Sequence, residues 1–146
     1  MRTLLVCSLL VLLSAAVLSE NADIKSRYKK FIHQHIYENM TANMCDNVMR
    51  EKEIYVKKTN KCKKINTFIL DNIKPVRAVC ENQGEPDGDM TKSRRRFHIV
   101  VCTLKNRKAK YPKCHYNGTK LHKKIKIKCE KGLPVHYDGN IGHCDN

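Results

Sequence analysis

CKKINTF, residues 62–68, places a lysine directly after a cysteine and a threonine four residues beyond that lysine. If the stretch is extended, Lys63 and Thr67 lie on one face and Asn66 and Phe68 on the other, because side chains alternate along a strand. A cation and a hydroxyl on one wall of a groove suit a nucleotide. The threonine hydroxyl can donate or accept, so it can pair with either uracil or cytosine. Lys64 is interpreted as solvated charge.

A histidine precedes this stretch, on a segment with helical spacing. From Ile24, apolar or aromatic residues recur up to Phe31 and Ile32, and His35 continues the same stripe. His35 should therefore point inward, whereas His33 lies about 200° around the helix and should face solvent. In isolation, an inward histidine is more often a buried structural residue than a catalyst.

A second histidine follows the stretch, in VHYD at residues 135–138. In a strand, His136 and Asp138 share one face, and Asp138 could hold one imidazole tautomer. Two histidines and a lysine are what a metal-free phosphodiesterase needs: one group removes a proton, one supplies a proton and one stabilises negative charge. The remaining histidines lack such context and are interpreted as surface residues: His98, His115, His122 and His143.

The N-terminus is typical of a secretory signal peptide. Arg2 precedes an apolar run from Leu4 to Leu13, and small residues follow. We expect residues 1–19 to be the signal, with cleavage between Ser19 and Ala22, and residues 20–146 to form one secreted, extracellular domain. This apolar run is too short to span a membrane.

Seven of the 8 cysteines lie beyond the signal, which predicts a disulfide framework in a small secreted protein. Six of them allow 15 pairings, and the sequence alone does not choose among these. A zinc site is a poor alternative because no C-x-x-C pair is present. The seven are Cys45, Cys62, Cys80, Cys102, Cys114, Cys129 and Cys144.

The order of patterns predicts an α+β fold, with helices first and an antiparallel sheet after them. Helices are expected from Ile24, around Met44–Met49, and over Phe68–Ile73 with an end before Pro75. Strands are expected over Phe97–Leu104 and Leu121–Cys129. A hairpin turn is expected at Asn117–Gly118, and an acidic loop at Asn82–Asp89.

Charge favours polyanionic partners. Without Arg2, 28 basic residues face 14 acidic ones, a net charge of +14. RNA, heparan-type sugars and anionic bacterial surfaces are candidate partners. The alternative is that the charge serves solubility alone. KSRRR at residues 92–96 has two interpretations as well, a solvated strand entry or a polyanion or nuclear-import motif.

These motifs together resemble those of the pancreatic-type ribonucleases. The resemblance rests on F-x-x-Q-H at 31–35, CK-x-x-NTF at 62–68, KYPKC at 110–114 and CEKGLPVH at 129–136, and it covers residues 28–138. Within that family, the chain most resembles the angiogenin branch and the fish ribonucleases. The acidic loop and the lack of a basic triplet near Arg50–Glu53 depart from angiogenin.

The resemblance implies a role for each site residue. His35 would be the general base, His136 the general acid and Lys63 the stabilising cation. Gln34, Asn66, Thr67 and Glu130 would contact substrate, with Thr67 selecting pyrimidines, while Phe68, Tyr137 and Asp138 would support the site. The implied reaction cleaves RNA 3′ to pyrimidines through a 2′,3′-cyclic phosphate, with no cofactor and no metal.

The resemblance also implies an architecture, with three short helices on a curved antiparallel sheet. It pairs Cys45 with Cys102, Cys62 with Cys114 and Cys80 with Cys129, each bond worth roughly 2–4 kcal/mol. Cys144 would then be free, capped or joined to a second molecule, in a chain that is otherwise monomeric. Asn39 and Asn117 stand in glycosylation sequons.

Two functions compete with the enzyme. One is a cationic antimicrobial protein that binds bacterial surfaces, and the other is an angiogenic ligand. Neither gives a physical reason to keep His35, Lys63 and His136 together, which favours the ribonuclease.

Overall fold

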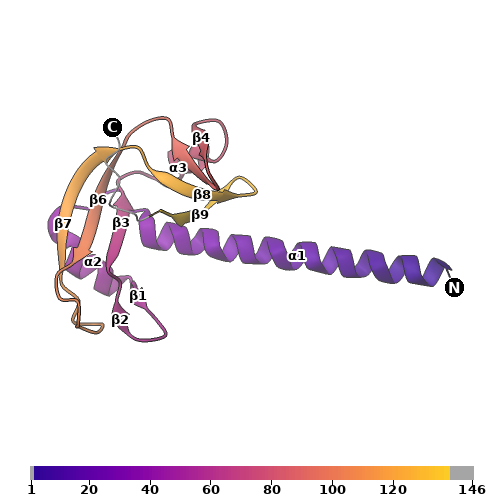
Figure 1. The fold of residues 1–146 in the computed structure, drawn as a ribbon, viewed down its shortest axis with the longest axis horizontal. Helices are drawn as coiled ribbons and strands as arrows, with labels where there is room; N and C mark the ends of the chain where they lie inside the picture. The colour runs from indigo at the N-terminus through magenta and orange to yellow at the C-terminus, as the bar shows by residue number, and fades with distance from the viewer. Residues whose placement is uncertain (1, 139–146) are drawn as a thin grey trace.

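The computed structural model describes residues 2–138, and its first element, α1 (Arg2–His35), is a helix of 34 residues. The expected apolar segment and the helix from Ile24 are thus one continuous helix, because neither glycine nor proline separates them. The N-terminal half projects away from the rest of the molecule (Figure 1), and Leu9, Leu12 and Leu18 are 58%, 65% and 67% exposed. The apolar run expected to be too short for a membrane span continues into α1, so that Val6–His35 is long and apolar enough to cross a membrane by length and composition, a property that signal sequences share.

Two further α-helices follow within the described residues. A 3₁₀ turn, η1 (Ala42–Met44), leads into α2 (Cys45–Glu51), which confirms the helix expected there. The helix expected over residues 68–73 is wrong, since α3 runs instead from Ile73 to Val79. Asn72 caps it by accepting the N–H of Lys74. Pro75 lies in the first turn, where its missing N–H has no helical partner to lose.

The strands of residues 2–138 form three antiparallel sheets, which confirms the α+β class with helices packed on antiparallel strands. In Figure 1, β6 and β7 run side by side and α1 ends against β3 and β9. The first sheet pairs β1 (Tyr55–Val56) with β2 (Lys61–Cys62). The second has the order β3 (Ile65–Ile69), β6 (Phe97–Leu104), β7 (Tyr116–Lys123). The third has the order β4 (Gly84–Asp87), β5 (Met90–Ser93), β8 (Lys126–Glu130), β9 (Leu133–Tyr137).

The hairpin turn expected at Asn117–Gly118 is wrong, because both residues lie inside β7 and pair with Thr103 and Cys102. A Cβ atom on Gly118 would lie 1.9 Å from the carbonyl oxygen of Ala42. The glycine therefore allows η1 to approach the strand closely, and it does not turn the chain.

Two other boundaries also differ from expectation. Half of the acidic loop expected at residues 82–89 is strand β4, whose hairpin with β5 turns at Gly88, where φ is +63°. The strand expected over residues 121–129 is divided between β7 and β8, because Ile125 bonds through its backbone to Ser93. The prediction of Phe97–Leu104 as a strand is confirmed.

Three disulfides join Cys45 to Cys102, Cys62 to Cys114 and Cys80 to Cys129, the pairing that the resemblance implied. The molecule has two apolar cores, and each disulfide joins two cysteines of the same core, the first two in one core and the third against the other. The core around Phe68 packs beneath α2, and the core around Phe31 lies among α1, α3 and the strands. Phe68 and Ile69 are neighbours on β3, but their side chains pack into different cores. β3 therefore lies between the two cores. Cys144 lies outside the described residues.

Candidate active site

A cleft of about 620 Å³ brings the three motifs together at the end of α1. α1 supplies one wall, the stretch from Lys63 to Thr67 a second, and β8 and β9 a third. All three residues expected to act directly in the reaction line it. The lining residues are Arg27, Lys30, Phe31, Gln34, His35, Lys63, Ile65, Asn66, Thr67, Lys128, Val135, His136 and Tyr137.

His35, the last residue of α1, is 7% exposed and points inward, as its helix face predicted. Its Nδ1 lies 2.8 Å from the backbone oxygen of Thr67. A carbonyl oxygen can only accept, so Nδ1 carries the proton and Nε2 holds a free lone pair. Phe31 and Tyr137 flank the ring, each with its ring centroid 5.3 Å away. This histidine is therefore fixed as a single tautomer.

The surroundings of His35 keep it neutral. Burial lowers its pKa to about 3, and the positive charge of Lys63 acts in the same direction, while the bond to Thr67 opposes both. At neutral pH the imidazole can accept a proton at Nε2. His33, by contrast, is exposed as predicted, and its Nε2 donates to the backbone oxygen of Lys52 at 2.6 Å.

Lys63 is held by an amide relay. Its Nζ donates to Oδ1 of Asn66 at 2.8 Å, and Nδ2 of Asn66 donates to the backbone oxygen of Gln34 at 2.8 Å. The expectation that Asn66 faces away from Lys63 is wrong, because the chain bends at Lys64 between β2 and β3 and strand alternation is lost there. Asn66 thus ties Lys63 to the end of α1.

Partial burial, together with the nearby charge of Lys30, lowers the pKa of Lys63 to about 8. An ammonium with this pKa is mainly protonated at pH 7. It is a stronger proton donor than an exposed lysine, because its neutral form is less disfavoured. It can therefore stabilise an oxyanion in the cleft by charge and by hydrogen bonding.

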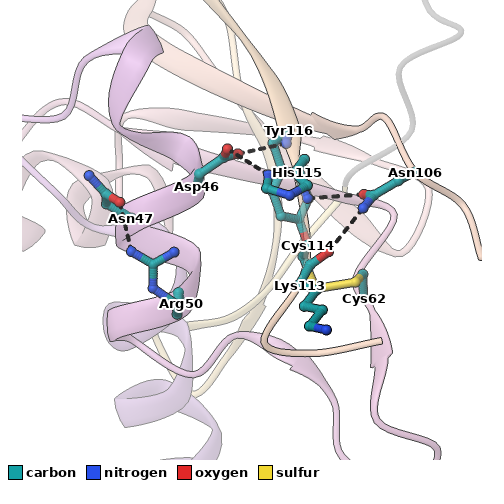
Figure 2. A network of polar contacts seen from close by, with 9 residues as sticks. All are labelled: Asp46, Asn47, Arg50, Cys62, Asn106, Lys113, Cys114, His115 and Tyr116. Carbon is teal, nitrogen blue, oxygen red and sulfur yellow. Dashed lines mark hydrogen bonds and ion pairs between the residues drawn. A yellow bond between two sulfur atoms is a disulfide. The ribbon is translucent and has the colours of Figure 1, made fainter. Parts of the chain in front are cut away.

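The backbone of Lys63 is held by Tyr116, whose Oη donates to the Lys63 carbonyl at 2.8 Å. Tyr116 belongs in turn to the network of Figure 2, in which its N–H donates to a carboxylate oxygen of Asp46 at 2.7 Å. Burial, with help from Asp46, raises the pKa of Tyr116 to about 12, so its hydroxyl remains a donor. Asp46 also pairs with His115, and Cys114 is bonded to Cys62. The network reaches the cleft through these contacts.

His136 lies on β9 with its side chain exposed, opposite Lys128 on β8. Val135 and Tyr137 are buried, which agrees with the alternation expected for this strand. The backbone N–H of Asp138 donates to Lys126 at 3.0 Å. Orientation of His136 by the Asp138 carboxylate stays a prediction.

Glu130 is ion-paired with Arg27, and this pairing lowers the pKa of its carboxyl group. Arg27 lines the cleft, whereas Glu130 is absent from its lining, so the base contact expected of Glu130 stays a prediction. Thr67 is buried in the cleft wall and Phe68 lies fully buried in the adjacent core.

Three cleft cations were not singled out from the sequence: Arg27, Lys30 and Lys128. The first two share a helix face with His35, because residues 27, 30, 31, 34 and 35 follow i, i+3, i+4, i+7, i+8 spacing. That spacing could have identified them. Lys128 depends on the pairing of β8 with β9 and has no comparable local signal.

Within residues 2–138, no group of three or more His, Cys, Asp or Glu side chains is arranged to hold a metal ion. The two sequon residues, Asn39 and Asn117, are both exposed.

Comparisons with known proteins agree on one family. The model of the pancreatic ribonuclease family matches residues 26–138, which include every cleft residue. Ribonuclease-like 3 of Danio rerio is 36% identical over 143 residues, covering 92% of this chain and 95% of the relative. Mouse angiogenin-3 is 36% identical over 116 residues, covering 77% of each chain. The X-ray structure of zebrafish RNase5 has a TM-score of 0.78 and 38% identity, covering 82% of this chain and 98% of that one.

Proposed function

Because this chain belongs to the pancreatic ribonuclease family, we propose that it is a secreted endoribonuclease that cleaves RNA on the 3′ side of pyrimidines. The observation that carries the proposal is the fixed tautomer of His35. Its Nε2 lone pair is free in a cleft that also contains Lys63 and His136.

In the proposed reaction, His35 Nε2 takes the proton of the ribose 2′-hydroxyl, and that oxygen attacks the neighbouring phosphorus. The bond from phosphorus to the 5′-oxygen breaks, and His136 gives this oxygen a proton. The products are a 2′,3′-cyclic phosphate and a free 5′-hydroxyl. Lys63 stabilises the extra negative charge on phosphorus between the two steps. The substrate supplies its own nucleophile, so DNA does not react and the reaction does not need a metal.

Thr67 supports the preference for pyrimidines. It is buried in the cleft wall, and its backbone already holds His35. A nucleobase paired with its hydroxyl would therefore be held close to the general base. Gln34 would contact a phosphate oxygen, and Asp138 would fix the tautomer of His136.

Secretion is supported by the N-terminal part of α1, which is apolar and exposed. We propose that residues 1–19 are removed and that residues 20–146 are the mature domain. The three disulfides suit an oxidising compartment.

Dinucleotide cleavage tests this function. Purified protein should cleave pyrimidine–purine dinucleotides, leave purine–purine dinucleotides nearly intact, and keep its activity in EDTA. His136→Ala should lower turnover by about 10²–10⁴-fold, while His33→Ala, at an exposed histidine outside the cleft, should change it little. Equal cleavage of both dinucleotide classes would refute the pyrimidine preference. Sensitivity to EDTA would refute the metal-free mechanism.

A host-defence role is a second candidate, favoured by three exposed arginines, Arg94, Arg95 and Arg96, on a chain of high positive charge. Attraction to anionic bacterial surfaces depends on charge, is screened by salt and does not involve the cleft. His136→Ala should then keep most bacterial killing, and replacing the three arginines by Ser should weaken it. Loss of killing in His136→Ala would show that killing depends on RNA cleavage.

An angiogenic role is supported only by similarity to proteins named angiogenin. An endothelial tube-formation assay with wild type and His136→Ala would separate a catalytic signal from a ligand signal.

A further inference from the structure

Two histidines outside the cleft form a pair on the sheet surface. His98 on β6 lies directly opposite His122 on β7, and both side chains are exposed. Their rings stack with centroids 4.2 Å apart and an angle of 14° between their planes. Neither residue lines the cleft, so the ribonuclease reaction does not account for the pair.

The backbone brings these two side chains as close as a sheet allows. The His98 carbonyl accepts from the N–H of Leu70 at 2.9 Å, which directs the polar groups of His98 away from β7. His98 and His122 are therefore a non-hydrogen-bonded pair, in which facing side chains come closest, with Cα atoms about 4.5 Å apart. Two imidazoles held this way can turn from the stacked arrangement so that one nitrogen of each faces a shared ion, since the sheet has already fixed their separation.

The surroundings of the pair are positively charged. Arg95 and Arg96 lie close enough to His122 to repel a cation there, although Arg95 is partly offset by its ion pair with Asp71. An ion with high affinity for nitrogen is therefore needed.

We propose that His98 and His122 form a two-histidine site for a late first-row transition-metal ion, Cu²⁺ or Zn²⁺. Imidazole suits both ions, and Cu²⁺ stands above Zn²⁺ in the affinity order. Since the described residues contain no group of three suitable ligands, water completes the coordination. Hard cations such as Mg²⁺, which prefer oxygen ligands, should not bind there.

The experiment is a titration with CuCl₂ or ZnCl₂, with electron paramagnetic resonance detecting nitrogen ligands on Cu²⁺ and thermal unfolding reporting both ions. His136→Asn serves as the background, so that the cleft histidines do not act as a competing pair. In this background His98→Asn and His122→Asn should each weaken binding at least about tenfold, because the second imidazole otherwise binds intramolecularly. His115→Asn, at another exposed histidine, is the matched control.

The expected result is a two-nitrogen Cu²⁺ signal and a metal-dependent rise in Tm, with both lost in His98→Asn and in His122→Asn and kept in His115→Asn. Dinucleotide turnover of His98→Asn made in the wild-type protein should stay unchanged. A two-nitrogen signal that survives both substitutions would overturn the proposal, as would a Cu²⁺ signal with one nitrogen in the parent. A rise in Tm with Cu²⁺ alone would restrict the site to copper, and a rise with both ions would show that the site binds late first-row transition-metal ions more generally.

Discussion

His35 and His136 reach the same cleft from opposite surroundings, one from the buried end of α1 and the other from β9, at the edge of its sheet. His35 is packed between Phe31 and Tyr137 and bonded to Thr67. His136 is exposed. The proposed general base, His35, must be neutral before the reaction, and burial favours this. The proposed general acid, His136, must regain its proton from water, and exposure allows this.

The contrast extends to Lys63, which lies on the buried side. Asn66 holds its ammonium group and Tyr116 holds its backbone. Substitutions on this side should therefore change folding and catalysis together, whereas substitutions at His136 should change catalysis alone.

The largest expected effect is loss of either histidine. His35→Ala and His136→Ala should each lower kcat/KM by about 10²–10⁴-fold, the usual contribution of one acid–base group. Only His35→Ala should also lower Tm, because it leaves the buried Thr67 carbonyl without its partner. Dinucleotide kinetics and thermal melts measure the two quantities.

His33→Ala is the control on the same helix. His33 is exposed, and its ring and its carbonyl both bond to Lys52 outside the cleft, so turnover should change little. Damage equal to that of His35→Ala would contradict the assignment of helix faces. Equal losses of Tm in His35→Ala and His136→Ala would remove the contrast between buried and exposed sides.

Loss of the Lys63 ammonium should come next. Lys63→Ala should reduce kcat about 10²–10³-fold, by analogy with removal of one oxyanion-stabilising donor. Lys64→Ala is the matched control, because that lysine is adjacent and exposed and lies outside the cleft. Similar losses in both variants would mean that general positive charge, and not the placement of Lys63, supports turnover.

Local periodicity was enough to orient both histidines. His35 continues an apolar helix stripe, and His136 alternates with two buried neighbours. A few residues therefore suffice to predict which way each side chain points. The strand Phe97–Leu104 could also be predicted from local sequence, since its β-branched run is buried between two other strands.

Local sequence patterns predict the wrong structure where distant parts of the chain decide the local conformation. Gly118 resembles a turn residue, but it is needed where η1 crosses β7, 76 positions away from Ala42. Pro75 resembles the end of a helix in the sequence, but the cap at Asn72 begins α3 just before it and places Pro75 in the first turn. The relay from Lys63 through Asn66 to Gln34 needs a bend at Lys64 that alternation does not predict. The pair of Arg27 with Glu130 joins residues 103 apart.

Acid should destabilise the protein through His35. Its pKa is about 3 in the folded state and about 6.5 when unfolded, so the unfolded chain binds more protons between these values. The stability from the neutral ring is fully present above pH 6.5 and is lost as pH falls toward 3. The slope from this one group is at most about 1.4 kcal/mol per pH unit.

Urea unfolding at several pH values from 7 to 4 measures this slope. His35→Asn should flatten the dependence relative to wild type, and His136→Asn serves as the matched control from the exposed side. An unchanged slope in His35→Asn would show that carboxylates, and not the buried imidazole, govern the acid response.

The smallest effect should come from Tyr116→Phe, which removes one hydroxyl and leaves the ring in place. The lost bond to the Lys63 carbonyl is worth about 0.5–1.5 kcal/mol, so kcat should fall about 2- to 10-fold if that bond positions the lysine. KM should change less, because Lys63 acts on charge that develops in the transition state. Tyr111→Phe is the matched control, since the Tyr111 hydroxyl also donates to a carbonyl, that of Arg50, at 3.0 Å. Tyr116 and Tyr111 thus make the same kind of bond, but only the Tyr116 bond ends on a residue of the cleft. A fall in Tm with unchanged kcat in Tyr116→Phe would show that the network of Figure 2 supports the fold alone and that Asn66 suffices to position Lys63.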